Sequence, residues 1–212
     1  MTGTIGSSNV ASAVVGTGFT KPHQMFRDSV RQFVDAHINP YVDEWEEAES
    51  FPAHDLFKKM GDQGFLGLSY DEEFGGLAGD YWYNVVLAEE LGRIHCTGVP
   101  MAIAVQTDMA TPALHQYGSE QLKQQFLAPA IAGDAVCAVA ITEPGAGSDV
   151  AGIRTRAEDK GDHYLLNGSK TFTSNGINAD LVVVVTKTDA DSRHGLSLLV
   201  VERGMEGFER GK

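Results

Sequence analysis

The segment 141–152, with the sequence ITEPGAGSDVAG, combines residue types that bind small polar ligands. Gly145 and Gly147 admit backbone angles that are closed to other residues, and they let a ligand approach the main chain. Successive free amide groups in such a loop form a concave surface that suits phosphate oxygens. Thr142 and Ser148 add a hydroxyl group on each side. The segment therefore offers neutral donors to an anionic, polar ligand; a plain glycine-rich connection between two strands is the alternative.

Known nucleotide-binding motifs do not fit this segment. It lacks the Gly-Lys-Ser/Thr ending of a Walker A loop, and Val150 stands where a dinucleotide fingerprint has its third glycine. The sequence also lacks the Gly-x-Ser-x-Gly motif of serine hydrolases. The seven histidines show no metal-ligand spacing, so we predict no metal site. Glu143, inside the segment, is interpreted as a carboxylate that stabilises the loop and not as an acid–base group.

Composition narrows the class of protein. Of 212 residues, 29 are acidic and 16 basic, and the net charge of −13 argues against a nucleic acid or an anionic membrane as partner. No apolar run approaches the roughly 20 residues of a membrane span. Residues 1–19 lack the basic start of a signal peptide and are predicted to be a flexible arm. Cys96 and Cys137 lie far apart and are predicted to be reduced. We therefore expect a cytoplasmic protein.

Residues 20–133 have a helical apolar period, which predicts an all-α N-terminal domain. Phe26, Val30 and Phe33 recur at steps of three and four, and Asn39-Pro40 ends this first helix. A second helix follows Pro52. Asp80 is the N-cap candidate of a third helix, which ends at Gly92. Two more helical patterns span Met101 to Tyr117 and Glu120 to Ala132.

Residues 134–212 are predicted to form an incomplete middle β domain. The apolar, β-branched run 136–142 suits a buried strand, and 180–187 and 196–202 read as further strands. Asn167-Gly168 lies between two strand-like pieces and is a strong hairpin signal. The fold class is therefore α+β, with a helical domain followed by an antiparallel, barrel-like β domain.

The segment 141–149 resembles the signature of the acyl-CoA dehydrogenases, flavoproteins that oxidise acyl-CoA thioesters. Four other segments resemble parts of the same family in the same order along the chain. They are 66–76 (LGLSYDEEFGG), 89–92 (EELG), 117–127 (YGSEQLKQQFL) and 166–176 (LNGSKTFTSNG). Several motifs in the correct order make the resemblance specific, and it extends from about residue 20 to the last residue.

The resemblance implies an FAD site. In the family, the segment matching 139–148 lines FAD, an aromatic residue at the position of Phe172 covers one face of the flavin, and residues matching Thr173 and Ser174 lie beside flavin N5 and O4. The implied FAD-binding residues are Val139, Ala140, Ile141, Thr142, Gly145, Gly147, Ser148, Phe172, Thr173 and Ser174.

One of these positions and one loop imply contacts with the substrate. Ser148 falls where the family contacts the flavin pyrophosphate and the acyl-CoA. The loop 189–194 matches a hairpin that approaches the CoA moiety, so Arg193 is a candidate phosphate contact; a solvated surface arginine is the alternative.

The implied reaction is the α,β-dehydrogenation of an acyl-CoA to the trans-2-enoyl-CoA, with electrons passed to an electron-transfer flavoprotein. In the family the general base is a glutamate of a C-terminal helical domain, and no residue of this chain matches it. We therefore assign no catalytic residue, expect the chain alone to be inactive, and expect a homotetramer or dimer at full length. A flavin oxidase or monooxygenase of the same fold and a non-catalytic subunit that binds FAD or CoA are the alternatives.

Overall fold

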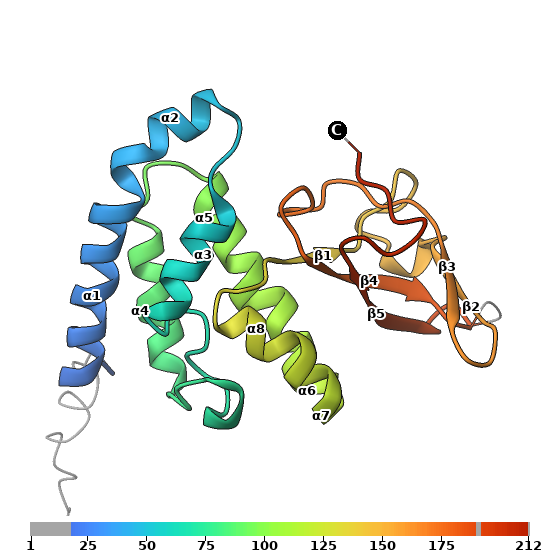
Figure 1. Cartoon of the computed structure of the whole chain (residues 1–212), viewed down its shortest axis with the longest axis horizontal. Helices are drawn as coiled ribbons and strands as arrows, with labels where there is room; N and C mark the ends of the chain where they lie inside the picture. The colour runs from blue at the N-terminus through green and yellow to red at the C-terminus, as the bar shows by residue number, and fades with distance from the viewer. Residues whose placement is uncertain (1–17, 190–191, 212) are drawn as a thin grey trace, which may run out of the picture.

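The computed structural model describes residues 18–189 and 192–211, and it consists of a helical part followed by a sheet part (Figure 1). The predicted α+β order, helices first and strands second, is confirmed. Residues 1–17 of the predicted flexible arm lie outside the described residues.

Among the described residues, the helical part contains five helices of at least seven residues and several shorter segments; the predicted end of the first helix before Asn39-Pro40 is confirmed, whereas the helix predicted from Met101 begins at Gly98. Asp80 caps its helix by accepting a hydrogen bond from the Trp82 amide at 3.0 Å. The elements are α1 (Lys21–His37), η1 (Asn39–Tyr41), α2 (Val42–Glu47), α3 (Ala53–Asp62), η2 (Glu72–Phe74), α4 (Tyr81–Leu91), α5 (Gly98–Ala104), η3 (Val105–Ala110), α6 (Thr111–Tyr117), α7 (Glu120–Leu122), η4 (Lys123–Leu127) and α8 (Ala128–Ile131).

Two stretches of the helical part differ from ordinary α-helix. The segments η3 and η4 have π geometry, in which the hydrogen bonds span one residue more than in an α-helix. The sequence patterns predicted continuous helices through both. Segments of this kind occur often at functional sites, and η3 lies next to the strand that leads into the candidate loop.

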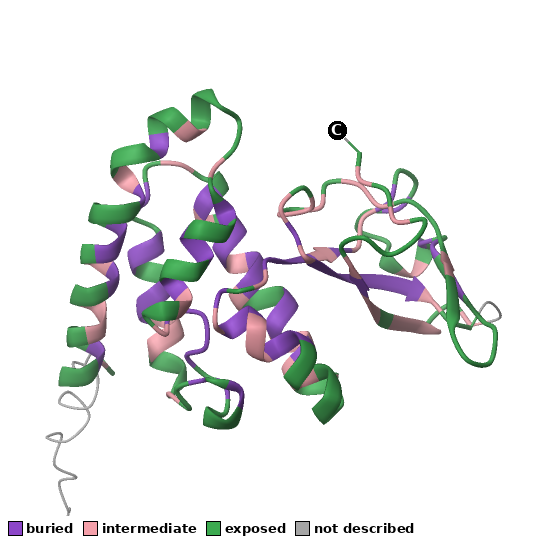
Figure 2. Cartoon of the chain, in the orientation of Figure 1, coloured by how far each residue is buried: buried purple, intermediate pink, exposed green. Residues whose placement is uncertain are grey.

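The sheet part is built around one central strand, β4. Its elements are β1 (Cys137–Ala140), η5 (Val150–Gly152), β2 (Arg156–Asp159), β3 (Tyr164–Asn167), β4 (Leu181–Lys187) and β5 (Leu196–Glu202). Residues 181–186 of β4 are all buried, as expected for a strand covered on both faces (Figure 2). Strand β4 pairs with β1, β2 and β5, and β3 pairs with β2 at the edge of the sheet.

The strand directions differ in part from the antiparallel prediction. The β2–β3 and β4–β5 pairs are antiparallel, whereas β4 runs parallel to β1 from Cys137↔Leu181 onward and parallel to β2 at Arg156↔Lys187. The strands form an open five-stranded sheet and not a closed barrel. The physical reason is that a long crossover, 141–180, separates β1 from β4, and such a connection allows parallel neighbours.

The predicted hairpin at Asn167-Gly168 is wrong. Strand β3 ends at Asn167, and no strand follows in residues 168–172. The hairpin lies one strand earlier, between β2 and β3, where the Lys160 amide donates to the His163 carbonyl at 2.9 Å and Gly161 has φ +97°. The residues after Gly168 instead form hydrogen bonds with the glycine-rich loop, a long-range partner that local turn chemistry cannot reveal.

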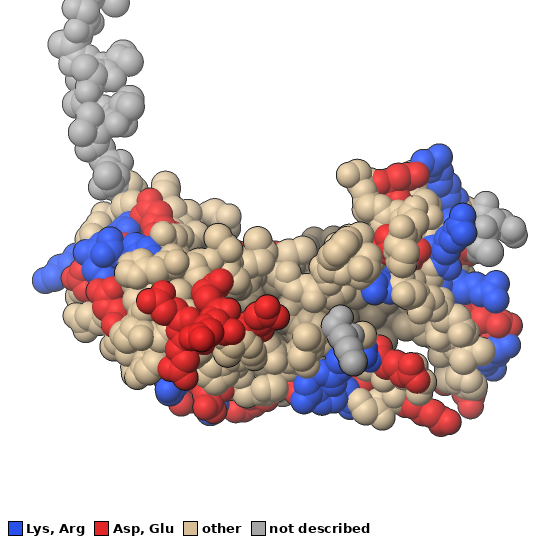
Figure 3. All heavy atoms as spheres, turned by 90° about the horizontal axis from the view of Figure 1, so that it is seen from above, with Lys and Arg blue, Asp and Glu red and all other residues tan. Residues whose placement is uncertain are grey.

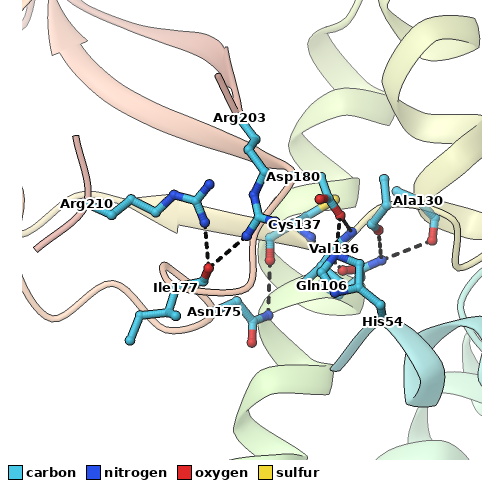
Figure 4. A network of polar contacts seen from close by, with 11 residues as sticks. His54, Gln106, Ala130, Val136, Cys137, Asn175, Ile177, Asp180, Arg203 and Arg210 are labelled. Atoms are coloured by element: carbon cyan, nitrogen blue, oxygen red, sulfur yellow. Dashed lines mark hydrogen bonds and ion pairs between the residues drawn. The ribbon is translucent and has the colours of Figure 1, made fainter. Parts of the chain in front are cut away.

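Gln106 joins the helical part to the sheet. Its side chain is buried in η3, where Nε2 donates to the carbonyl oxygens of Ala130 at 3.0 Å and Ala135 at 2.9 Å. Its Oε1 accepts the amide hydrogen of Cys137 at 2.8 Å (Figure 4). One amide side chain therefore joins the start of β1 to α8 and to the connection that follows α8.

Asp180 makes a second connection at this junction. Its Oδ2 accepts the Val136 amide at 2.9 Å and also contacts Nε2 of His54, on α3, at 2.9 Å (Figure 4). The starts of both β1 and β4 thus contact the helical part, so the position of β1 is fixed before the chain enters the candidate loop.

We predict that Gln106→Leu lowers the free energy of unfolding by about 3 kcal/mol, because it preserves the volume but removes three hydrogen bonds and leaves the buried Cys137 amide without its partner. Urea unfolding monitored by circular dichroism measures the change, and Gln121→Leu on exposed α7 is the control. Equal stability of the two variants would show that the junction does not depend on Gln106.

Candidate functional site

The glycine-rich loop begins with a tight turn at its proline. The amide of Glu143 donates to the Ala146 carbonyl at 2.9 Å, and the Ala146 amide donates back at 3.2 Å. Gly145 and Gly147 do not have the left-handed backbone that would require glycine. A Cβ at either position would meet no atom of the chain within 4 Å. The expected need for unusual backbone angles is therefore wrong here, and the two glycines instead leave the main chain accessible.

The Glu143 carboxylate organises this loop. It is buried, and it accepts the backbone amides of Arg154 at 2.6 Å and Thr155 at 2.9 Å. The ammonium of Lys170 lies 2.9 Å from its Oε1 and also donates to the Ile141 carbonyl at 2.9 Å. One carboxylate thus connects the loop, the approach to β2 and the segment after β3. These contacts agree with the interpretation of Glu143 as a loop-stabilising residue.

The environment of Glu143 keeps it ionised. Burial by itself opposes ionisation, but the Thr155 side chain, the backbone amides of Arg154 and Thr155 and the Lys170 ammonium together outweigh it and lower the pKa of Glu143 to about 2. A carboxylate with so low a pKa is a poor proton acceptor at neutral pH. Glu143 therefore contributes a fixed negative charge to the loop.

A second segment, 171–174, lies directly beside the loop. The Thr171 amide donates to the Thr142 carbonyl at 2.9 Å, which joins the two segments. The next residue, Phe172, has φ +55°, and its side chain is 91% exposed. A bulky residue in the left-handed region costs about 1 to 2 kcal/mol, and such strain is concentrated at binding sites. The fold therefore presents an aromatic ring to the outside at an energetic cost.

The structure brings together most of the residues that the sequence predicted for the site. The strand end 139–142 and the segment 172–174 are neighbours, since Lys170, Thr171 and Asn175 all bond to the 137–142 stretch. The side chains differ in accessibility. Ala140 is buried; Val139, Ile141, Thr142 and Thr173 are half-buried; Gly145, Gly147, Ser148, Phe172 and Ser174 are exposed.

Arg193, in the connection between β4 and β5, lies beside the far end of the glycine-rich loop. Its Nη2 contacts Oδ1 of Asp149 at 3.2 Å, and both side chains are largely exposed. The β4–β5 connection is thus brought next to Ser148. The pairing with Asp149 partly neutralises the guanidinium that the sequence suggested as a phosphate contact.

Sequence reasoning gave no role to Lys170 and Asn175, although both fall inside the quoted segment 166–176. Glu143, an acidic residue directly after the apolar run 136–142, was the available signal, because a buried carboxylate needs a cationic or amide partner. The sequence did not indicate which residue that partner would be.

Other features of the surface lie apart from the loop. A cavity of about 710 Å³ in the helical part is lined by residues that include Phe65, Tyr70, Asp108 and His115, and by none of the predicted FAD-binding residues. In one view, a dense acidic cluster covers part of the helical half, whereas Lys and Arg side chains are interspersed with Asp and Glu on the sheet half (Figure 3). The acidic cluster therefore disfavours an anionic ligand on that part of the helical half.

Neither a membrane span nor a metal cluster is found in the described ranges 18–189 and 192–211. None of their helices is long and apolar enough to cross a membrane. Nor do three or more His, Cys, Asp or Glu residues there form a group that could hold a metal ion.

Two family models match nearly all of the described chain. The model described as "Acyl-CoA dehydrogenase, N-terminal domain" matches residues 20–134, and "Acyl-CoA dehydrogenase, middle domain" matches residues 138–212. The chain belongs to the acyl-CoA dehydrogenase family. The resemblance inferred from the sequence motifs is thereby confirmed.

Individual relatives agree with this assignment. The chain is 42% identical over 197 residues to the long-chain specific acyl-CoA dehydrogenase, mitochondrial, of Rattus norvegicus, covering 92% of this chain and 45% of the rat protein. A crystal structure of acyl-CoA dehydrogenase from Geobacillus kaustophilus superimposes with a TM-score of 0.86 at 43% identity, covering 92% of this chain and 51% of that one. The chain thus spans about half the length of these relatives.

A third relative was crystallised with the reduced cofactor. The glutaryl-CoA dehydrogenase of Mycobacterium smegmatis in complex with FADH2 has a TM-score of 0.81 and 32% identity, covering 90% of this chain and 48% of that one. At least one acyl-CoA dehydrogenase of this fold has therefore been crystallised with a bound flavin.

We predict that Glu143→Gln is less stable than the wild type by about 3 kcal/mol at pH 7, because the lowered pKa of Glu143 corresponds to stabilisation of that size. This stabilisation is present above the ordinary glutamate pKa of 4.5 and is lost as the pH falls toward 2, so the difference between the two proteins should shrink over that range.

Denaturant unfolding at several pH values between 7 and about 2 measures this difference. Glu206→Gln, which makes the same charge change at an exposed position, is the control. A constant difference across the whole range would contradict the assigned role of the Glu143 charge.

Proposed function

We propose that this chain binds FAD and forms the N-terminal and middle parts of an enzyme that dehydrogenates an acyl-CoA thioester to the trans-2-enoyl-CoA. Residues 20–133 would act as the helical domain and 134–212 as the middle domain. The proposal rests mainly on Phe172, whose backbone is in the left-handed region and whose ring is exposed beside a loop with an accessible main chain.

The residues around Phe172 fit a flavin dinucleotide. The Phe172 ring would cover one face of the isoalloxazine, as aromatic rings do when they stack. Thr142, Thr173 and Ser174 would offer hydroxyl or amide donors to the polar edge of the flavin. These donors are neutral, and they favour negative charge that develops on the ring during reduction.

The phosphate end of FAD would lie at the turn. The exposed Gly145 and Gly147 leave their backbone accessible, and Ser148 adds a hydroxyl group. Val139, Ala140 and Ile141 would contribute mainly through the main chain, since Ala140 is buried and the other two are half-buried. When bound, FAD would serve as the acceptor of two electrons from the substrate.

The substrate and partners follow from the family. We propose an acyl-CoA as substrate, with Ser148 and Arg193 near its CoA moiety, an electron-transfer flavoprotein as electron acceptor, and a homotetramer or dimer as the assembly. Glu143 is fixed by amide and ammonium contacts and does not serve as the base. The proton acceptor would come from outside residues 1–212.

We also propose a cytoplasmic location. The free thiols Cys96 and Cys137 are compatible with a reducing compartment. The rat relative is named as mitochondrial, so fractionation of cells that express the complete reading frame is the direct measurement.

We predict that the protein from the complete reading frame purifies yellow or takes up one FAD, and that Phe172→Leu raises the FAD dissociation constant about 10-fold, because it removes the stacked ring. Quenching of flavin fluorescence measures the affinity, and Tyr164→Leu, on the edge strand β3, is the matched control. A protein that neither contains nor binds FAD would refute the proposal.

We predict that flavin reduced by an acyl-CoA is reoxidised rapidly by an electron-transfer flavoprotein and slowly by air. Stopped-flow absorbance with butyryl-, octanoyl- and palmitoyl-CoA as reductants measures both rates. Fast reoxidation by air would instead indicate a flavin oxidase or monooxygenase of the same fold.

A further inference from the structure

Asn175 connects three elements through a single side chain. Its Nδ2 donates to the carbonyl oxygen of Ala102, in α5, at 2.9 Å and to that of Cys137, in β1, at 3.0 Å. The second of these bonds is visible where the helical part meets the sheet (Figure 4). Both amide hydrogens are thus used on carbonyl groups that belong to different halves of the molecule.

The backbone of Asn175 is also constrained. Its φ is +63°, a conformation that glycine and asparagine tolerate better than other residues. Its carbonyl oxygen accepts the amides of Asn178 at 2.9 Å and Ala179 at 2.7 Å, which closes the turn that leads into β4. Both the side chain and the main chain of Asn175 therefore have fixed partners.

The segment 172–174 lies between two such anchors. Thr171 is bonded to the Thr142 carbonyl on one side, and Asn175 is bonded to α5 and β1 on the other. Within the segment, Phe172 and Ser174 are exposed and Phe172 is strained. The position of these side chains consequently depends on the two anchors and not on packing of their own.

The helix to which Asn175 is bonded also has an accessible side. Met101, next to Ala102, is 54% exposed, and α5 continues directly into the π segment η3, where Met109 is also exposed. The Asn175 side-chain amide bonds to α5 and directly follows residues 172–174, so it fixes the distance between these two surfaces. A ligand on α5 and η3 would therefore lie at a fixed distance from a ligand on residues 172–174.

We propose that Asn175 is a positioning residue, which sets the distance and orientation between the flavin contacts of residues 172–174 and the helix α5. This role rests on the proposed function, since it has meaning only if residues 172–174 contact FAD. Because both amide hydrogens of Asn175 are bonded to backbone carbonyl groups, it would act through the three residues before it.

Two substitutions separate positioning from simple folding. Asn175→Asp preserves size and the left-handed backbone but replaces two donors by a carboxylate that faces two carbonyl oxygens. Asn175→Gly also tolerates the backbone and removes the side chain altogether. Asn178→Asp is the matched control, because it makes the same chemical change three residues along, at a side chain that bonds to nothing in the described part of the chain.

The proteins are produced from the complete reading frame and saturated with FAD. The measurements are the position and fine structure of the visible flavin absorption band, visible circular dichroism, and kcat and KM with butyryl-, octanoyl- and palmitoyl-CoA and an artificial electron acceptor. We expect Asn175→Asp to change the flavin spectrum and to lower kcat about 100-fold, the size of effect that a misplacement of about 1 Å produces, with a smaller change in KM.

The pH dependence gives a signature that a purely structural role would not produce. A protonated aspartate can donate one hydrogen bond, so the flavin spectrum of Asn175→Asp should move back toward that of the wild type as the pH falls. Asn175→Gly should change the spectrum without this recovery, and it remains informative if Asn175→Asp does not fold.

The proposal is overturned if both Asn175 variants keep the wild-type flavin spectrum and kcat, as Asn178→Asp is expected to do, even when their melting temperatures fall. A wild-type protein that binds no FAD would overturn the proposed function, and this inference with it. A wild-type protein that binds FAD normally, next to unaffected Asn175 variants, would overturn this inference alone.

Discussion

The candidate site depends on one buried charge, the Glu143 carboxylate. Removing a carboxylate from water costs several kcal/mol unless hydrogen bonds and a counter-charge replace its hydration. Here two backbone amides and the Lys170 ammonium do so. Because the same Lys170 also bonds to the Ile141 carbonyl, satisfying this charge forces the segments before and after the β2–β3 hairpin to meet. The accessible glycines and the exposed Phe172 ring are placed by that requirement.

The rest of the structure supports this arrangement through side-chain amides and not through apolar contacts alone. Gln106 and Asn175 each bond to backbone groups of the junction between the helical part and the sheet, and neither carries a charge. Satisfied buried amides of this kind specify one geometry, since any shift leaves a polar group without a partner. The backbone around the loop is thereby held at fixed positions by uncharged side chains at the junction and by the Glu143–Lys170 pair within the loop.

Local signals in the sequence predicted the helices well. The end of α1 before Asn39-Pro40 and the Asp80 cap of α4 depend only on residues within a turn of one another. The same applies to the continuous apolar run of β4. The π geometry of η3 was not predictable in this way, because the Gln106 side chain that it buries bonds to residues 24 to 31 positions further along.

The sequence alone determined the order of helices and strands and the family, because each rests on a local pattern or a motif. The tertiary structure decided the parallel pairing of β1 with β4, the failure of Asn167-Gly168 to form a hairpin, and the hydrogen-bond partners of Lys170 and Asn175. These features depend on which distant groups satisfy one another's hydrogen bonds and charge. Which groups pair depends on the free energy of the whole fold, so the neighbouring residues in the sequence do not indicate it.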